Sequence, residues 1–178
     1  VGGISAILHG ATYVTFDLDI VHRRTPENVR RLLSALRTLE AVYRHDPRAV
    51  VPEESHLLGK GHNLLQTTCG PLDALGEITP GLTYDDLLPD SEELRLAPGT
   101  STKVLSLRRL IDVKAAAGRQ KDLLALPALR ATLAEIEKKG QAAMWDVLQE
   151  DQKARGALPV RWTQADLLNL AVTFSLTA

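Results

Sequence analysis

The sequence predicts an α+β fold, in which a small sheet flanked by helices is followed by a helical C-terminal part. Residues 13–21 alternate between apolar and polar side chains, two short strand-like stretches lie within residues 63–78, and helical periodicity dominates after them. At 178 residues, the chain is expected to form one compact unit. We expect a core over residues 1–105 and a helical region over residues 106–178 packed on it.

The first strand is predicted from Tyr13 to Val21. Its apolar side chains belong to Val14, Phe16, Leu18 and Ile20, and those on the opposite face to Thr15, Asp17 and Asp19. Asp17 and Asp19 then point the same way, with Cα atoms about 6.5 Å apart. Carboxylates this close repel one another, and Mg²⁺ between them removes the repulsion. The alternative is a pair of solvated acids on an exposed strand.

A glycine pair precedes this strand by the length of a short helix. Gly2 and Gly3 are followed by a helical stretch from Ile4 to Leu8, which Gly10 ends. A glycine turn before a helix leaves backbone N–H groups free, and these suit a phosphate. Taken alone, a glycine pair indicates only a turn.

A helix with a clear start follows the first strand. Thr25 is a suitable N-cap, and Pro26 suits the first helical position. We predict an amphipathic helix over Pro26–Arg44 and then a loop over Asp46–Gly61, where Pro and Gly interrupt regular structure.

The later elements are predicted from turn residues and periodicity. They are strands at Asn63–Thr68 and Pro71–Ile78 joined through Gly70, an acidic turn-rich stretch at Ile78–Gly99 with room for a short helix, and a strand at Thr102–Leu105. The helices that follow are Leu107–Ala117 between its N-cap Ser106 and Gly118, a helical stretch that Pro127 splits and whose second part is Ala128–Lys139, and helices at Gln141–Arg155 and Gln164–Ser175.

Two further charged residues lie among apolar neighbours. Asp73 falls within a predicted strand, where a carboxylate needs a partner or must face water at a sheet edge. Lys114 lies at the edge of an apolar helical stripe, where it either snorkels to solvent or binds an anion. Asp122 opens the following helix, where an acid also favours the helix dipole.

These motifs together resemble a known family. Gly2-Gly3-x-Ser5 followed by Asp17-x-Asp19 is similar to the signature of the DNA polymerase β-like nucleotidyltransferase superfamily, and most of all to its bacterial AbiE- and MenT-type toxin group. Leu72-Asp73-Ala74-Leu75 resembles the setting of the family's third carboxylate, and the segment 110–122 its helix-to-helix connection. Most members carry an Arg before the Thr of the Asp-x-Asp strand, where this chain has Tyr13-Val14.

The resemblance implies a nucleotidyltransferase fold with a small mixed sheet and a Mg²⁺- or Mn²⁺-dependent transfer from a nucleoside triphosphate such as ATP or CTP. It implies metal ligands at Asp17, Asp19 and Asp73, a phosphate cradle at Gly2, Gly3 and Ser5, triphosphate contacts from Lys114, Arg119 and Lys121, and an orienting role for Asp122. The acceptor it implies is the tRNA 3′ end, with the chain as the toxin of a toxin–antitoxin pair and an antitoxin protein as partner.

Two alternatives stay open at this point. One is a nucleotidyltransferase that modifies a protein or a small molecule, as antidote- and resistance-type enzymes do. The other is a catalytically silent binding module with the same fold. The basic segment from Lys103 to Lys121 is compatible with phosphate contacts, although a solvated helix face has the same composition.

Composition bounds these hypotheses. The formal net charge of −1 argues against general binding of polyanions. The single cysteine, Cys69, excludes an internal disulfide and is expected to be a buried structural thiol, and the five histidines lack the spacing of metal ligands. No apolar run suits a membrane span and no signal-peptide pattern opens the sequence, so we expect a cytoplasmic protein without a membrane partner.

Overall fold

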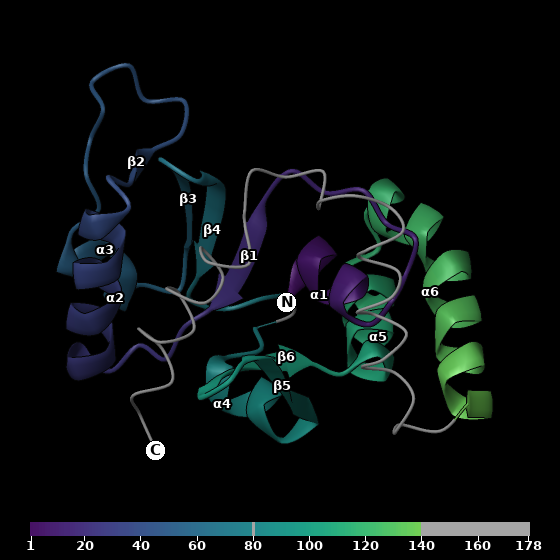
Figure 1. Cartoon of the computed structure of the whole chain (residues 1–178). Helices are drawn as coiled ribbons and strands as arrows, with labels where there is room; N and C mark the ends of the chain where they lie inside the picture. The colour runs from purple at the N-terminus through teal and green to yellow at the C-terminus, as the bar shows by residue number, and fades with distance from the viewer. Residues whose placement is uncertain (80, 140–178) are drawn as a thin grey trace.

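A computed structural model describes residues 1–79 and 81–139 of the chain (Figure 1). The elements are α1 (Gly2–Leu8), β1 (Leu18–Val21), α2 (Pro26–Thr38), β2 (Val42–Tyr43), α3 (Glu54–Leu58), β3 (His62–Thr67), β4 (Gly70–Leu75), α4 (Tyr84–Leu87), the 3-10 turn η1 (Leu88–Asp90), β5 (Ser91–Ala97), β6 (Thr100–Leu105), α5 (Leu107–Ala117) and α6 (Gln120–Lys139). The predicted α+β class is confirmed: a mixed four-stranded sheet with helices precedes the helices of the C-terminal half.

The four-stranded sheet has the order β1-β4-β3-β2. β1 runs parallel to β4, whereas the other neighbours are antiparallel. β5 and β6 form a separate antiparallel pair. In the main sheet Asp19 lies opposite Asp73, and Asp73 lies opposite Leu64, so all three side chains stand on the same face.

The other face of the sheet packs against α2. Val29, Leu32 and Leu36 of this helix are fully buried in one cluster with Leu65 and Leu72 of the sheet. The helix starts as expected, because the Thr25 hydroxyl accepts a hydrogen bond from the backbone N–H of Asn28 at 3.4 Å. With its apolar side occupied, the sheet presents its polar side chains on the opposite face.

α1 connects this core to a second one. Ile4 belongs to the sheet cluster, whereas Ala6 belongs to a cluster built mainly by α5 and α6. Figure 1 shows α1 between the sheet and these two helices. Leu105 of β6 and Leu110 of α5 both lie in the second cluster, which therefore contains residues from both sides of the predicted boundary at 105/106.

The first strand is shorter than predicted. Regular pairing begins only at Leu18, and Val14 and Phe16 are 67% and 71% exposed instead of buried. The chain bends at Phe16 and Asp17, so the pairing of β1 with β4 begins at Leu18 and Leu72. The predicted apolar face of residues 13–21 is therefore wrong before Leu18.

Other boundaries also differ from the prediction. α2 ends at Thr38 because Glu40 takes a left-handed conformation (φ 52°), and β2 follows where the helix was expected to continue. The loop over 46–61 contains α3, and the acidic stretch contains β5. α6 continues through Pro127, so the predicted interruption there is wrong. The predicted helices Gln141–Arg155 and Gln164–Ser175 lie outside the described residues.

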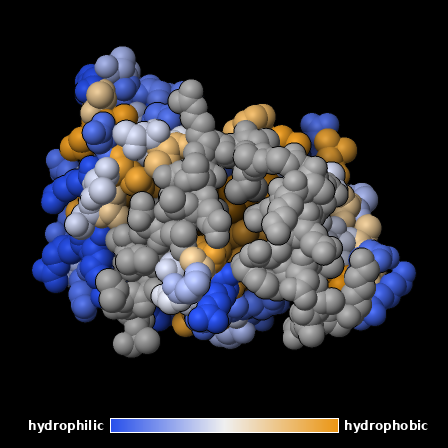
Figure 2. Space-filling view, viewed as in Figure 1, coloured by the Kyte–Doolittle hydropathy of each residue, from blue (hydrophilic) through white to orange (hydrophobic). Residues whose placement is uncertain are grey.

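Hydrophilic and hydrophobic residues are unevenly distributed over the surface. Figure 2 shows hydrophilic side chains over the outer side of α2 and hydrophobic colour along the upper edge, over the segment between α1 and β1. Val14 and Phe16 of that segment are among the exposed large apolar residues. Within residues 1–79 and 81–139, the helices are too short or too polar to cross a membrane. Cys69, expected to be buried, is half-buried.

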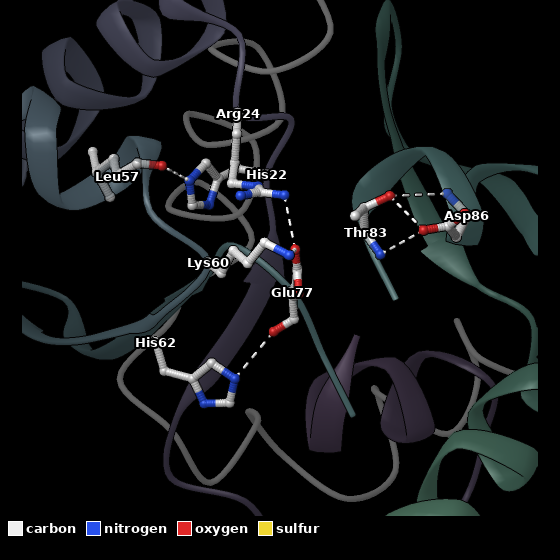
Figure 3. Close-up of polar contacts among 8 residues, drawn as sticks. All are labelled: His22, Arg24, Leu57, Lys60, His62, Glu77, Thr83 and Asp86. Carbon is white, nitrogen blue, oxygen red and sulfur yellow. Dashed lines mark hydrogen bonds and ion pairs between the residues drawn. The ribbon is translucent and has the colours of Figure 1, made fainter. Parts of the chain in front are cut away.

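A polar cluster joins the ends of β1 and β4 to the loop after α3 (Figure 3). The Glu77 carboxylate forms ion pairs with Arg24 at 2.8 Å and with Lys60 at 3.3 Å. The backbone carbonyl oxygen of Glu77 lies 3.0 Å from His62 Nε2. His22 is 3% exposed and its Nε2 donates to the Leu57 carbonyl at 2.8 Å. Figure 3 also shows Thr83 and Asp86 bonded to each other at the start of α4.

His22 is expected to make the stability of the fold pH-dependent. Burial lowers the pKa of His22, a hydrogen bond to Leu57 partly offsets this, and the nearby Arg24 lowers the pKa further. The unfolded chain therefore takes up this proton first, and stability is lost as the pH falls below about 6.5.

His22→Gln keeps a donor for the Leu57 carbonyl without the titration. Urea unfolding between pH 7.5 and 5.5 should give a shallower loss of stability for His22→Gln than for the wild type. The same substitution at the exposed His45 is the control. If the free energy of unfolding falls equally with pH in the wild type and in His22→Gln, this role of His22 is contradicted.

Candidate metal centre

Three carboxylates meet on the polar face of the sheet. Asp19 and Asp73 are register partners on β1 and β4, and Asp17 precedes Asp19 by two residues, in the bend that leads into β1. One oxygen from each side chain lies within 4.8 Å of the other two. The hypothesis requires Asp73 to share a side with Asp17 and Asp19, and it does. Among the described residues, this is the one group of at least three acids, histidines or cysteines placed to share an ion.

Positive charges and burial act on the Asp19 carboxylate in opposite directions. Burial raises the pKa of Asp19, the charge of Asp17 raises it further, and the positive charges of Lys114 and Lys121 lower it. The Thr15 hydroxyl donates a hydrogen bond of 2.7 Å to Asp17 Oδ1 and so orients that carboxylate. Hard oxygen donors at this spacing fit Mg²⁺ or Mn²⁺.

The glycine pair packs directly against the acids. Gly2 has φ +69°, and a Cβ at this position would lie 1.8 Å from Asp19 Oδ2. A Cβ on Gly3 would lie 2.5 Å from Thr15 Cβ. The pair therefore allows α1 to approach β1 closely, beside the edge that β4 does not occupy (Figure 1).

Gly2→Ala is expected to displace the Asp19 carboxylate and to weaken binding of Mn²⁺ by about tenfold or more, because a clash at 1.8 Å must move a ligand. Gly10→Ala is the matched control, since Gly10 also has a positive φ (+83°) but open space around it. Both variants carry about 1 kcal/mol of backbone strain. Isothermal titration with Mn²⁺ separates them, and equal affinity in the two variants would contradict the close approach.

A buried charge network lies next to the acids. Asp122 is fully buried and accepts hydrogen bonds from Lys114 Nζ at 2.8 Å and from Arg119 Nε at 2.5 Å. Lys114 is 7% exposed, and its Nζ also lies 3.4 Å from the Tyr13 hydroxyl and 5.2 Å from the centre of the Tyr13 ring. Lys114 is thus not a snorkelling side chain, and Asp122 is a partner that it shares with Arg119.

The predicted basic segment is mostly neutralised within the protein. Its ion pairs are Lys103–Glu93, Arg108–Glu137, Arg109–Asp90, Lys114–Asp122 and Arg119–Asp122. Lys121 is exposed and, of the six cations in the segment, is the one without an ion pair to another described residue. Arg23 and Arg24 are likewise paired, with Asp85 and Glu77. The segment therefore offers less free positive charge than its composition indicates.

The Ser5 side chain is buried beside β6. It is 2% exposed, and its hydroxyl donates to the Leu105 carbonyl at 3.1 Å. His9 Nε2 lies 2.8 Å from the same carbonyl. The structure thus gives the Ser5 hydroxyl a partner inside the second core, which argues against the expected contact of this hydroxyl with phosphate. Of the predicted cradle, the backbone of Gly2 and Gly3 lies beside the acids.

Sequence analysis did not identify Arg44. Its Nη2 forms an ion pair with Asp73 Oδ1, and the two side chains are 21% and 13% exposed. Arg44 was expected to end a helix, and the signal that would have found it is the pairing of β2 with β3. The backbone N–H of Arg44 donates to the Leu64 carbonyl at 2.8 Å, and Leu64 lies opposite Asp73.

Comparison with known proteins adds no family assignment. No protein-family model matches the chain, and no curated protein matches its sequence. The site itself therefore carries the functional argument: three acids that could hold a divalent metal, with two lysines and a glycine turn beside them.

Proposed function

We propose that the chain is a Mg²⁺-dependent nucleotidyltransferase of the DNA polymerase β-like superfamily. The observation that carries the proposal is that Asp73 meets Asp17 and Asp19 at one point of the sheet, although it lies far from them along the chain. The glycine pair, the Asp-x-Asp motif and the buried pair of Lys114 and Asp122 follow one another along the chain in the order that the resemblance predicts. A chance cluster of surface acids does not account for all three together.

The reaction proposed is attack of an acceptor hydroxyl on the α-phosphorus of a nucleoside triphosphate, with pyrophosphate as the leaving group. Asp17, Asp19 and Asp73 would hold the divalent cations, whose charge favours ionisation of the hydroxyl and departure of pyrophosphate. Asp73 would accept the proton of the hydroxyl. The protein supplies alignment and charge and forms no covalent bond to the substrate.

Lys114 and Lys121 supply positive charge for the triphosphate. The ammonium of Lys114 has three donors, of which Asp122 and the Tyr13 hydroxyl engage two. The third donor has no hydrogen-bond partner among the described residues, and both lysines influence the Asp19 carboxylate. Tyr13 lies in the short segment where the resembled family carries an arginine, and it contacts Lys114 instead.

The acceptor proposed first is the 3′ end of tRNA, which follows from the resemblance to the toxin group. An acceptor of lower charge, a protein side chain or a small molecule, is the second candidate. It is favoured by the internal pairing of the basic segment, which leaves few free cations for an RNA backbone.

The test uses the full chain with Mg²⁺, each of the four ribonucleoside triphosphates labelled at the α-phosphate, and either total tRNA, a protein extract or a small-molecule extract. A parallel reaction carries the label at the γ-phosphate. Transfer of the α-label to one acceptor class, with the γ-label released as pyrophosphate, is the expected result.

Label on tRNA supports the toxin-type function, and label on protein or on small molecules supports the second candidate. Transfer of the γ-label in place of the α-label would show phosphoryl transfer instead. Absence of any transfer, with all triphosphates and all three acceptor classes, would contradict the enzymatic proposal.

A further inference from the structure

Arg44 reaches the candidate metal centre from the far edge of the sheet. It follows β2, and its backbone is held by the hydrogen bond to Leu64 of β3. Leu64 is the register partner of Asp73, which is in turn the partner of Asp19. One row across the sheet therefore reads Arg44, Leu64, Asp73 and Asp19, and the long Arg44 side chain crosses the Leu64 position to reach Asp73.

The guanidinium and a metal ion require the same carboxylate. Arg44 Nη2 bonds Asp73 Oδ1, while the triad oxygens lie within 4.8 Å of one another. Asp73 is mostly shielded from water, so it needs a positive partner in either state. Among the described residues, Arg44 is the single ion-pair partner that Asp73 has.

The other cations act elsewhere in the site. Lys114 is bound to Asp122, and the influence of Lys114 and Lys121 falls on Asp19. Arg44 is the cation that pairs directly with Asp73. Its Nε is buried without a hydrogen-bond partner among the described residues, so the guanidinium is only partly satisfied where it stands.

We propose that Arg44 is a built-in counter-ion, which holds Asp73 in the metal-free protein and must release it when a divalent cation binds. Arg44 thereby lowers the affinity of the site for the cation and sets the concentration at which the site fills. The inference rests on the metal centre of the proposed function. The Arg44 backbone stays fixed on β2 and β3, so the side chain alone needs to move.

If Arg44 only supported the site, its removal would change the metal affinity in the opposite direction. If the guanidinium served to orient Asp73 for the metal, its removal would weaken metal binding. If it competes with the metal, its removal strengthens binding, because no ion pair has to be given up. The direction of the change in affinity therefore separates the two roles.

The experiment is isothermal titration of the full chain with Mn²⁺ for the wild type, Arg44→Gln and Arg48→Gln. Arg48 is the matched control: it is 79% exposed, pairs with Asp46 in the same loop, and its replacement changes the net charge equally. We expect Arg44→Gln to lower the Kd for Mn²⁺ by about tenfold, as for a largely buried charge pair, and Arg48→Gln to change it by less than about twofold.

Arg44→Lys is the second variant, and its Kd should lie between those of the wild type and Arg44→Gln. Thermal unfolding should show a lower Tm for metal-free Arg44→Gln and a larger rise in Tm on adding Mn²⁺. An unchanged or higher Kd in Arg44→Gln, with the wild type binding Mn²⁺, would overturn the inference and leave the metal centre standing. Failure of every protein to bind Mn²⁺ would overturn both.

Discussion

Asp17→Asn is expected to reduce nucleotidyl transfer by about a thousandfold or more while leaving the fold intact. The variant loses one charged metal ligand, and its remaining Oδ1 can still accept the hydrogen bond from Thr15. Because the charge of Asp17 adds to the raised pKa of Asp19, its removal should also relieve that repulsion and stabilise the metal-free protein. The site is thus a region where function opposes stability.

Initial rates of α-label transfer and thermal unfolding in the absence of metal measure the two effects. Asp112→Asn, at an exposed position on α5, is the control and should alter neither quantity. Transfer by Asp17→Asn at a rate near that of the wild type would remove Asp17 from the mechanism. A large drop in Tm would instead show that the carboxylate is structural.

Asp122→Asn is expected to destabilise the protein by about 3 kcal/mol, because it leaves the buried Lys114 ammonium without a charged partner. For a chain of this size the Tm should fall by about 6–12 °C. Burial alone would raise the pKa of Asp122, but the hydrogen bonds from Lys114 and Arg119 outweigh it and lower this pKa. The stabilisation should accordingly be lost as the pH falls below about 4.

Urea unfolding at pH 7 measures this loss of stability, and two further variants are compared with Asp122→Asn. Arg119→Gln should cost about 0.5 kcal/mol, since its side chain is 61% exposed. Lys114→Met combined with Asp122→Asn should recover part of the loss, because the unpaired ammonium is then absent. A loss below about 1 kcal/mol for Asp122→Asn alone would contradict the account of this network.

The local pattern predicted which acids would share a face but not how long their strand would be. The alternation from Thr15 to Asp19 placed Asp17 and Asp19 together, and the apolar setting of Asp73 indicated that it needed a partner. The strand length depended on where the chain meets β4, at Leu18 and Leu72, and a reading of one stretch at a time does not include that neighbour.

The missed features depend on contacts between distant residues. Arg44 meets Asp73 only because β2 pairs with β3 and β3 with β4, and the left-handed turn at Glu40 that permits β2 has no apolar periodicity to mark it. The basic segment appeared free in sequence because its partners, such as Asp90 and Glu137, lie outside it. Capping residues, by contrast, act locally, and the predicted bounds of α5 are confirmed.

Mn²⁺ binding, followed by electron paramagnetic resonance of the free ion, is the most direct test of the central claim that Asp17, Asp19 and Asp73 act together. The account predicts that the wild type binds Mn²⁺ and that replacing any one of the three by Asn weakens binding at least about tenfold. Asp112→Asn should bind as the wild type does. A wild type that binds no Mn²⁺ at millimolar concentration, or one triad variant that binds it unchanged, would contradict the account.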